Sequence, residues 1–195
     1  MLSYNESLKI LKETKALLEG HFILSSGLHS RQYIQCAKLL SYPAKAEAIC
    51  ASLCEKIKKK INKIDIILSP ALGGIVVGYE IGRQLNKQTI FAEKINNKLF
   101  LRRGFSIKPD SNVLIVEDVI TTGKSALECS NIIKENDANL VGYVCIIDRS
   151  NNEISIKDQI ISQLKFNIET FSKDKLPEDL KKIPPSKPGS STLSK

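Results

Sequence analysis

The chain contains no run of apolar residues close to the ~20 that a membrane-spanning helix needs. Its N-terminal region lacks the unbroken apolar core of a signal peptide, because charges interrupt it at Glu6, Lys9, Lys12, Glu13 and Lys15. The five cysteines include no C-x-x-C pair and no ligand-like histidine spacing, which argues against structural zinc. We therefore expect a cytoplasmic protein with no membrane partner, whose cysteines are small buried hydrophobes.

The chain also lacks a basic stripe or a set of interleaved aromatic residues that would indicate nucleic-acid binding. Its 29 basic and 21 acidic residues give a net charge of +8, which suits any polyanion and names none. Part of that excess lies after Phe171, where lysines, prolines and small polar residues predict a flexible tail over residues 172–195. We expect a single domain over residues 1–171 and no nucleic-acid partner.

Hydrophobic periodicity predicts an α/β fold. Ser3 and Glu6 have capping-box spacing and start a helical pattern that runs to Gly20, while residues 21–35 read as strand, turn and strand. A helix is expected after Pro43. Continuous apolar segments at 64–68, 113–117 and 140–147, separated by helical patterns, are typical of central parallel strands covered on both faces.

The most informative segment is VLIVEDVITTGKS, residues 113–125, where an apolar strand ends in Glu117 and Asp118 before a Thr/Gly loop and a helix. The loop would offer backbone N–H groups, hydroxyls and a helix N-terminus to one phosphate, and Gly123 would allow close approach. The two acids would repel phosphate but could accept hydrogen bonds from the hydroxyls of a sugar. The segment therefore predicts binding of a ribose phosphate.

Two other interpretations apply to this segment. Gly123, Lys124 and Ser125 match the end of a P-loop, but the first glycine of that pattern falls on Asp118, whose carboxylate would oppose a polyphosphate. Alternatively, Glu117 and Asp118 merely cap the following helix, and the sequence leaves this alternative open. A second Gly-rich stretch, SPALGG at residues 69–74, either aims backbone N–H groups at another anion or forms a plain strand-to-helix turn.

Residues 113–125 resemble the PRPP-binding motif of type I phosphoribosyltransferases, with four hydrophobic residues, two acids and a Thr/Gly phosphate loop. The flanking text is similar to that of the orotate enzymes, at GHFILSSGLHS (20–30), SPALGGIVVG (69–78), FAEK and LRRGF (91–105) and IIDRS (146–150). The resemblance implies a twisted parallel central sheet flanked by helices and a small hood formed mainly by residues 1 to about 40. It also implies a magnesium cofactor and a homodimer with shared active sites.

The resemblance further implies site residues. PRPP would be bound by Glu117, Asp118, Val119, Ile120, Thr121, Thr122, Gly123, Lys124 and Ser125. Pyrophosphate would be bound by Ala71, Leu72, Gly73 and Gly74, and orotate by Thr121, Arg149, Ser26 and Gly27. Magnesium is expected mainly through PRPP oxygens, without protein ligands.

Family members cover the site with a mobile loop rich in Lys, Arg and His. Here the corresponding text is EKINNKLFLRRGF, which contains Lys94 but no histidine. Lys94 and Asp118 are the catalytic candidates, while a β-hairpin through Asn96-Asn97 with solvated charges is the competing interpretation. Upstream, Ser25 stands where many relatives have lysine, and His29 is interpreted as an exposed turn histidine.

The predicted reaction transfers the phosphoribosyl group of PRPP to orotate and gives orotidine 5′-monophosphate and pyrophosphate. The alternatives are a purine phosphoribosyltransferase, or a non-catalytic PRPP-sensing regulator of the same fold that binds nucleic acid.

Overall fold

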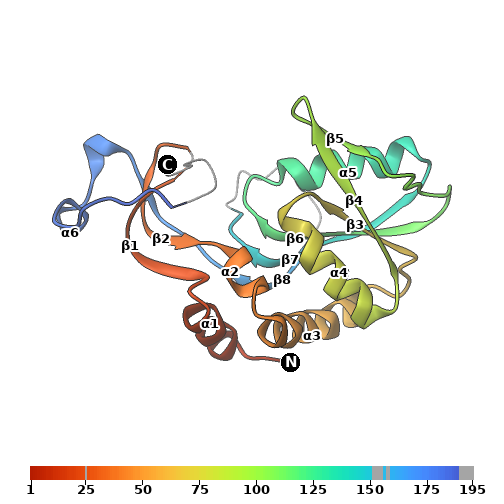
Figure 1. Cartoon of the computed structure of the whole chain (residues 1–195), viewed down its shortest axis with the longest axis horizontal. Helices are drawn as coiled ribbons and strands as arrows, with labels where there is room; N and C mark the ends of the chain where they lie inside the picture. Colours follow the sequence, from red (N-terminus) through yellow and green to blue (C-terminus); the bar gives the residue numbers. More distant parts are fainter. Residues whose placement is uncertain (25, 151–155, 157–158, 189–195) are drawn as a thin grey trace.

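A computed structural model describes residues 1–24, 26–150, 156 and 159–188. Its core is a six-stranded sheet of order β5-β4-β3-β6-β7-β8 (Figure 1). The strands are β3 (Ile66–Pro70), β4 (Gln88–Ile95), β5 (Lys98–Leu101), β6 (Asn112–Ile120), β7 (Asn139–Asp148) and β8 (Ile160–Lys165). All neighbouring pairs are parallel except β4 and β5, so the predicted parallel sheet is confirmed with one antiparallel edge strand.

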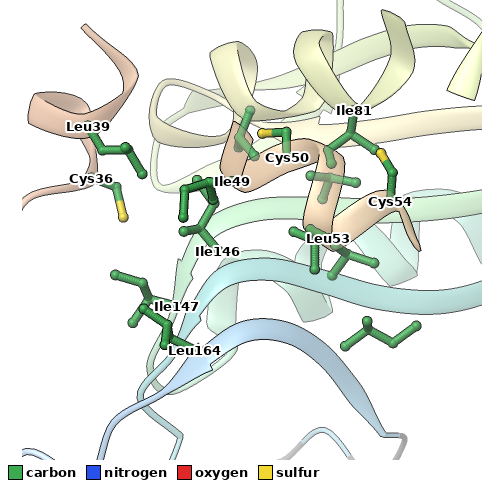
Figure 2. Packing of buried hydrophobic residues seen from close by; sticks show 14 of the residues in the cluster. Cys36, Leu39, Ile49, Cys50, Leu53, Cys54, Ile81, Ile146, Ile147 and Leu164 are labelled. Atoms are coloured by element: carbon green, nitrogen blue, oxygen red, sulfur yellow. The ribbon is translucent and has the colours of Figure 1, made fainter. Parts of the chain in front are cut away.

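Helices cover both faces of this sheet, which explains the continuous apolar strands. On one face, α3 (Pro43–Lys60) and α4 (Gly73–Leu85) pack against Leu114 and Val116 of β6, and on the other α5 (Lys124–Glu135) packs against Val113 and Ile115. Figure 2 shows the first of these clusters, where Ile49 of α3 lies near Ile146. All five cysteines are free and buried, as predicted.

The N-terminal helix α1 (Tyr4–Glu13) starts with the predicted capping box of Ser3 and Glu6. It ends earlier than predicted, because Lys15 adopts a φ of 55° that interrupts the helix. The following residues form strand β1 (Leu17–Ile23), in which Leu17 pairs with Ile34. The apolar spacing of this stretch fitted a helix, but pairing with the next strand decided its conformation.

A hood stands beside the sheet at the left of Figure 1 and contains a three-stranded sheet of order β1-β2-β9. The strands β1 and β2 (His29–Ile34) confirm the predicted strand, turn and strand, and α2 (Cys36–Leu40) leads from them to α3. The third strand, β9 (Thr170–Phe171), comes from the opposite end of the chain. The hood is therefore built from both ends of the sequence.

The segment after β9 differs from the predicted flexible tail. It forms the 3₁₀ helix η1 (Lys173–Lys175) and the short helix α6 (Glu178–Lys181), and it packs on the hood through Leu180, which is 1% exposed. An ion pair between Arg31 and Asp179 fixes α6 to β2. The prediction failed because these contacts depend on residues ~150 positions away in sequence. Residues 189–195 lie outside the described part. Across the described ranges, no helix is long and apolar enough to cross a membrane.

Candidate active site

Three predicted motifs meet at one edge of the core sheet. The glycine-rich turn with Ala71 and Leu72 follows β3, the Thr/Gly loop follows β6, and Arg149 follows β7. These strands are parallel neighbours, so their carboxyl ends lie together, where ligands of open α/β sheets bind. Val119 and Ile120 complete β6 opposite Ile147 and Asp148.

The turn after β3 lies directly against the motif acid Asp118. A Cβ added at Gly73 would lie 2.7 Å from Asp118 Oδ1, closer than carbon and oxygen can approach. The Ala71–Leu72 peptide bond is cis, and the Ala71 N–H donates to the Ala92 carbonyl at 2.8 Å. Gly73 and Gly74 are the first residues of α4, so their N–H groups lack intrahelical partners. This arrangement favours a binding role over a plain turn.

The two motif acids belong to opposite faces of the sheet. Successive residues of β6 alternate, so Glu117 follows Ile115 toward α5, while Asp118 follows Val116 toward α4. Burial, and next the charge of Asp118, raises the pKa of Glu117 to about 8, against a hydrogen bond from Ser125. Burial also raises the pKa of Asp118, although backbone N–H groups of residues 118 and 119 oppose the shift.

The Thr/Gly loop is open at its tip. Thr121, Thr122 and Lys124 are exposed, and the Lys124 N–H donates weakly to Thr122 Oγ1 at 3.4 Å. The N-cap residue of α5 is Gly123 at φ 74°, so neither Glu117 nor Asp118 occupies the N-cap position of this helix. Free N–H groups of the first helical turn and exposed hydroxyls can therefore surround a phosphate.

Arg149 is the basic residue that the sequence alone would assign to the surface, yet it is partly buried. Its backbone N–H donates to the Ile120 carbonyl at 2.8 Å, beside the Thr/Gly loop. Within the described structure, its buried Nε has no hydrogen-bond partner. Burial lowers the pKa of the guanidinium, an effect that nearby Tyr33 opposes. A buried cationic donor without a partner suits an anionic ligand.

Tyr33 of β2 was missed by the sequence interpretation. It interacts electrostatically with Arg149, and its hydroxyl donates to Gln35 Oε1 at 2.7 Å. It thus brings the hood to the sheet edge. No local pattern could have identified it, because Tyr33 and Arg149 are more than 100 residues apart in the sequence.

The other predicted hood residues, Ser26 and Gly27, are exposed in the turn between β1 and β2. This turn is closed by bonds from the Leu24 N–H to the Leu28 carbonyl and from the Gly27 N–H to the Leu24 carbonyl. Among the described residues, no hydrogen bond joins Ser26 or Gly27 to Arg149. The position of Ser25 lies outside the described residues.

The segment predicted as a mobile loop is the β4–β5 hairpin. Lys94 pairs with Leu99 across it, and the turn residues Asn96 and Asn97 both have positive φ, as two-residue hairpin turns require. Lys94 belongs to the face of β4 that carries Ala92, which packs toward α5. A hairpin is therefore confirmed as the backbone conformation of this stretch, whereas the role of Lys94 stays a prediction.

The cations of this hairpin fall into two groups. Both Arg102 and Arg103 pair with Glu93, at 3.6 and 2.7 Å, on the face opposite Lys94. No ion pair of Lys94 or Lys98 occurs among the described residues. Lys94 is therefore available to an incoming anion without first breaking an ion pair.

The prediction of an exposed turn histidine at position 29 is wrong. His29 is 7% exposed, and its Nδ1 lies 2.7 Å from Nε2 of the buried His21. The sequence places the two histidines eight residues apart, and only the strand pairing of the hood brings the rings together.

The chain is similar to known proteins over most of its length. The family model "Phosphoribosyl transferase domain" matches residues 41–174. A protein of Caldicellulosiruptor saccharolyticus named orotate phosphoribosyltransferase is 46% identical over 183 residues, which are 94% of this chain and 95% of that protein. A protein of Caldicellulosiruptor bescii with the same name is 45% identical over the same shares.

Solved structures share the fold. An orotate phosphoribosyltransferase from Aeropyrum pernix matches with a TM-score of 0.71 and 22% identity, covering 81% of this chain and 92% of that one. An adenine phosphoribosyltransferase from Saccharomyces cerevisiae matches with a TM-score of 0.64 and 19% identity, covering 80% and 99%. The fold is thus common to enzymes for different bases, whereas the sequence similarity is specific, and the chain belongs to the orotate phosphoribosyltransferase family.

Proposed function

We propose that this protein transfers the phosphoribosyl group of PRPP to orotate in the cytoplasm, a step of pyrimidine nucleotide synthesis. The observation that carries the proposal is the buried Nε of Arg149, which has no partner among the described residues and lies beside Tyr33 at the sheet edge that holds the Thr/Gly loop. The carboxylate of orotate would complete the hydrogen bonding of this guanidinium. A neutral purine base has no such group.

PRPP would occupy the edge between the two glycine loops. Its 5-phosphate would lie in the loop of Thr121–Ser125, and its pyrophosphate against the turn of Ala71–Gly74. Asp118, which contacts the turn at Gly73, would accept hydrogen bonds from ribose hydroxyls between them. Glu117, which faces α5, would also accept hydrogen bonds from ribose hydroxyls, at the end of the ribose that carries the 5-phosphate.

Orotate would bind where the hood meets the sheet edge. Arg149 would pair with its carboxylate, Thr121 would contact the ring, and the backbone of Ser26 and Gly27 would read its polar edges. Tyr33 would close the pocket from the hood, since it lies beside Arg149. Two observations support these assignments. Among the described residues the Nε donor of Arg149 has no hydrogen-bond partner, and Thr121, Ser26 and Gly27 are exposed.

The reaction would be a displacement at C1 of the ribose. The bond from C1 to the pyrophosphate oxygen breaks, its electron pair leaves with pyrophosphate, and a pyrimidine ring nitrogen of orotate forms the new bond to C1 and releases its proton to solvent. The N–H of orotate is already acidic, so the protein needs no strong base. Its residues orient both substrates, while Lys94 would neutralise charge that grows on pyrophosphate.

Magnesium is the proposed cofactor, bound mainly through PRPP oxygens. The described residues contain no cluster of three or more His, Cys, Asp or Glu side chains suited to a metal. The edge does provide the hard carboxylate oxygens of Glu117 and Asp118, which suit Mg²⁺ in the company of phosphate oxygens. When bound there, magnesium would neutralise the pyrophosphate.

We also propose a homodimer with shared active sites. Helix α4 and the residue before it expose a row of apolar side chains, Leu72 at 84%, Val76 at 50% and Tyr79 at 66%. Their spacing places them on one face of the helix, directly beside the pyrophosphate turn. A second copy covering this face would lie next to the site and could complete it.

The test is the consumption of orotate by purified protein with PRPP and magnesium, with adenine, hypoxanthine and uracil run in parallel. We expect turnover of orotate alone, and its loss in Asp118→Asn and in Arg149→Ala. Turnover of a purine would instead assign a sister activity. If no base reacts while PRPP and RNA both bind, the protein is a regulator.

A further inference from the structure

The buried histidine pair of the hood lies outside the site described above. His21 falls in a β-bulge of β1, where the pairing with β2 shifts register between Glu19 and Phe22. Bulges redirect side chains and free backbone groups from the strand ladder. Here the Nε2 atom of His21 lies 2.7 Å from Nδ1 of His29 at the start of β2. The backbone carbonyl of His21 binds a segment outside β2.

That partner is the segment after α6, which runs along the outer edge of β1. The Ser186 N–H donates to the His21 carbonyl, and the Ile23 N–H donates to the Ser186 carbonyl, both at 2.8 Å. His21 Nδ1 also lies 2.8 Å from the Ile183 carbonyl. His21 therefore joins three segments: the bulge, the start of β2 and residues 183–186.

The rest of the segment is attached at only a few places. Arg31 of β2 donates to both carboxylate oxygens of Asp179, at 2.9 and 2.8 Å. Beside this ion pair is a cavity of about 470 Å³, whose walls include Ser30, Leu180 and Ile183. Packing is interrupted there, so the segment is held by the buried side chain of Leu180 together with the polar contacts.

The contacts of His21 and Ser186 end where the substrate-facing turn begins. Ile23 precedes Leu24, whose N–H closes the turn on the Leu28 carbonyl, and His29 follows Leu28. The histidine pair thus holds both ends of the turn that carries Ser26 and Gly27.

We propose that the His21–His29 pair and residues 179–186 form a positioning joint that holds the turn of Ser26 and Gly27 in place for orotate. This inference rests on the proposed function, because it takes this turn to contact orotate. His21 and His29 act through the backbone of the turn and do not touch the substrates.

The contacts of the two rings indicate which nitrogens carry hydrogen when both rings are neutral. The Ile183 carbonyl can only accept, so His21 Nδ1 carries hydrogen and donates to it. In neutral His21 the other nitrogen, Nε2, is then an acceptor, and His29 Nδ1 must donate to it. An asparagine amide reaches the position of imidazole Nδ1, whereas a glutamine amide reaches that of Nε2.

This assignment gives a matched pair of variants. His29→Asn keeps a donor where Nδ1 was, and His29→Gln does not, although glutamine is closer to histidine in volume. A role in packing alone would therefore make His29→Asn the more damaged variant. A hydrogen-bonded joint makes His29→Gln the more damaged one.

The experiment measures KM for orotate and for PRPP in the full-length enzyme, together with hydrogen exchange of the Ile23 and Ser186 amides. In His29→Gln we expect the KM for orotate to rise about 5- to 10-fold, the KM for PRPP to change less than about twofold, and both amides to exchange faster. His29→Asn should keep all values within about threefold of wild type. Arg31→Ala, at a half-exposed site, should shift the orotate KM in the same direction and decides the matter if His29→Gln does not fold.

Several results would overturn the joint. These are equal changes in both KM values, greater damage in His29→Asn, or faster amide exchange with an unchanged KM for orotate. A wild-type enzyme that does not consume orotate would instead refute the proposed function, and the exchange measurement would still report whether the histidines hold the segment.

Discussion

Arg149 is the residue whose surroundings bear most directly on substrate choice. Its guanidinium is partly buried, its Nε has no partner within the described structure, and burial lowers its pKa, so placing it there costs free energy. Function and stability should therefore oppose each other at this position. The same burial that destabilises the free protein makes the side chain a strong ligand for a carboxylate.

Replacing Arg149 by methionine should separate these two effects. Methionine is about as long as arginine but is apolar. We therefore expect Arg149→Met to melt at or above the wild-type temperature, while kcat/KM for orotate falls at least about 100-fold. Thermal melts without ligand and steady-state kinetics measure the two quantities. A variant that melts well below wild type would show that the guanidinium stabilises the free fold, contrary to this account.

Glu117 gives the stability of the protein a pH dependence. Burial and the neighbouring Asp118 raise its pKa in the folded state to about 8, from an ordinary value of 4.5. A raised pKa means that the folded state holds the proton more tightly, so this stabilisation is full below about pH 4.5 and is lost as pH rises through about 8. The free energy of unfolding should fall across this window.

Glu117→Gln removes this titration and is therefore the control for the wild-type protein. Between pH 5.5 and 8.5, we expect the free energy of unfolding of wild type to decrease by over about 1 kcal/mol more than that of Glu117→Gln. Urea denaturation of both proteins at both pH values measures the difference. Parallel pH profiles would mean that Glu117 ionises normally in the folded protein.

At the scale of elements, the contact between the β3–α4 turn and β6 shapes the PRPP site. A methyl group at Gly73 would overlap the carboxylate of Asp118, so Gly73→Ala must displace one of them. We expect a loss of about 1–3 kcal/mol in unfolding free energy and a higher KM for PRPP. In an Asp118→Ala background, the same substitution should cost little stability, because the overlapping group is gone. Equal costs in the two backgrounds would place the strain elsewhere.

The sequence could predict those elements whose determinants are local. The strand, loop and helix order of residues 113–125 is confirmed, because continuous apolar residues, a turn glycine and helical spacing all agree there, although β6 continues to Ile120, three residues beyond its predicted end. The first helix was predicted too long because the spacing of Leu11, Lys15 and Leu18 also fitted a helix. The sequence left the choice between a hairpin and a mobile loop undecided for β4 and β5, because Asn96-Asn97 suits a tight turn as well as a loop.

At the scale of the whole molecule, the apolar face of α4 and the position of Lys94 lead to a test of shared sites. If Lys94 serves the neighbouring copy, a hybrid dimer of Lys94→Ala and Asp118→Asn subunits has one site with both changes and one intact site. Random mixing should therefore restore about a quarter of the wild-type activity from two inactive proteins. Tyr79→Asp, placed in the apolar face, should yield monomers in sedimentation experiments.

The control for this mixing is Asp118→Asn with Arg149→Ala, two variants that we expect to be inactive. They should not complement, because both residues belong to the same subunit's part of the site and each site of a hybrid dimer therefore carries one of the two changes. Recovery in that control would point to reassembly of partly active proteins. No recovery in the Lys94 mixture, with dimers present, would assign Lys94 to its own subunit's site.

By itself, the sequence determined the α/β class, the apolar strands, the Thr/Gly loop with its two acids, and the resemblance that led to orotate. Each of these is written in neighbouring residues, because strand burial, turn chemistry and phosphate loops depend on local spacing. The tertiary structure alone decided that Asp118 touches Gly73, that Arg149 is buried beside Tyr33, and that the C-terminal segment joins His21 in the hood. These features join residues 45 to more than 160 positions apart, and such contacts form only when the whole chain packs.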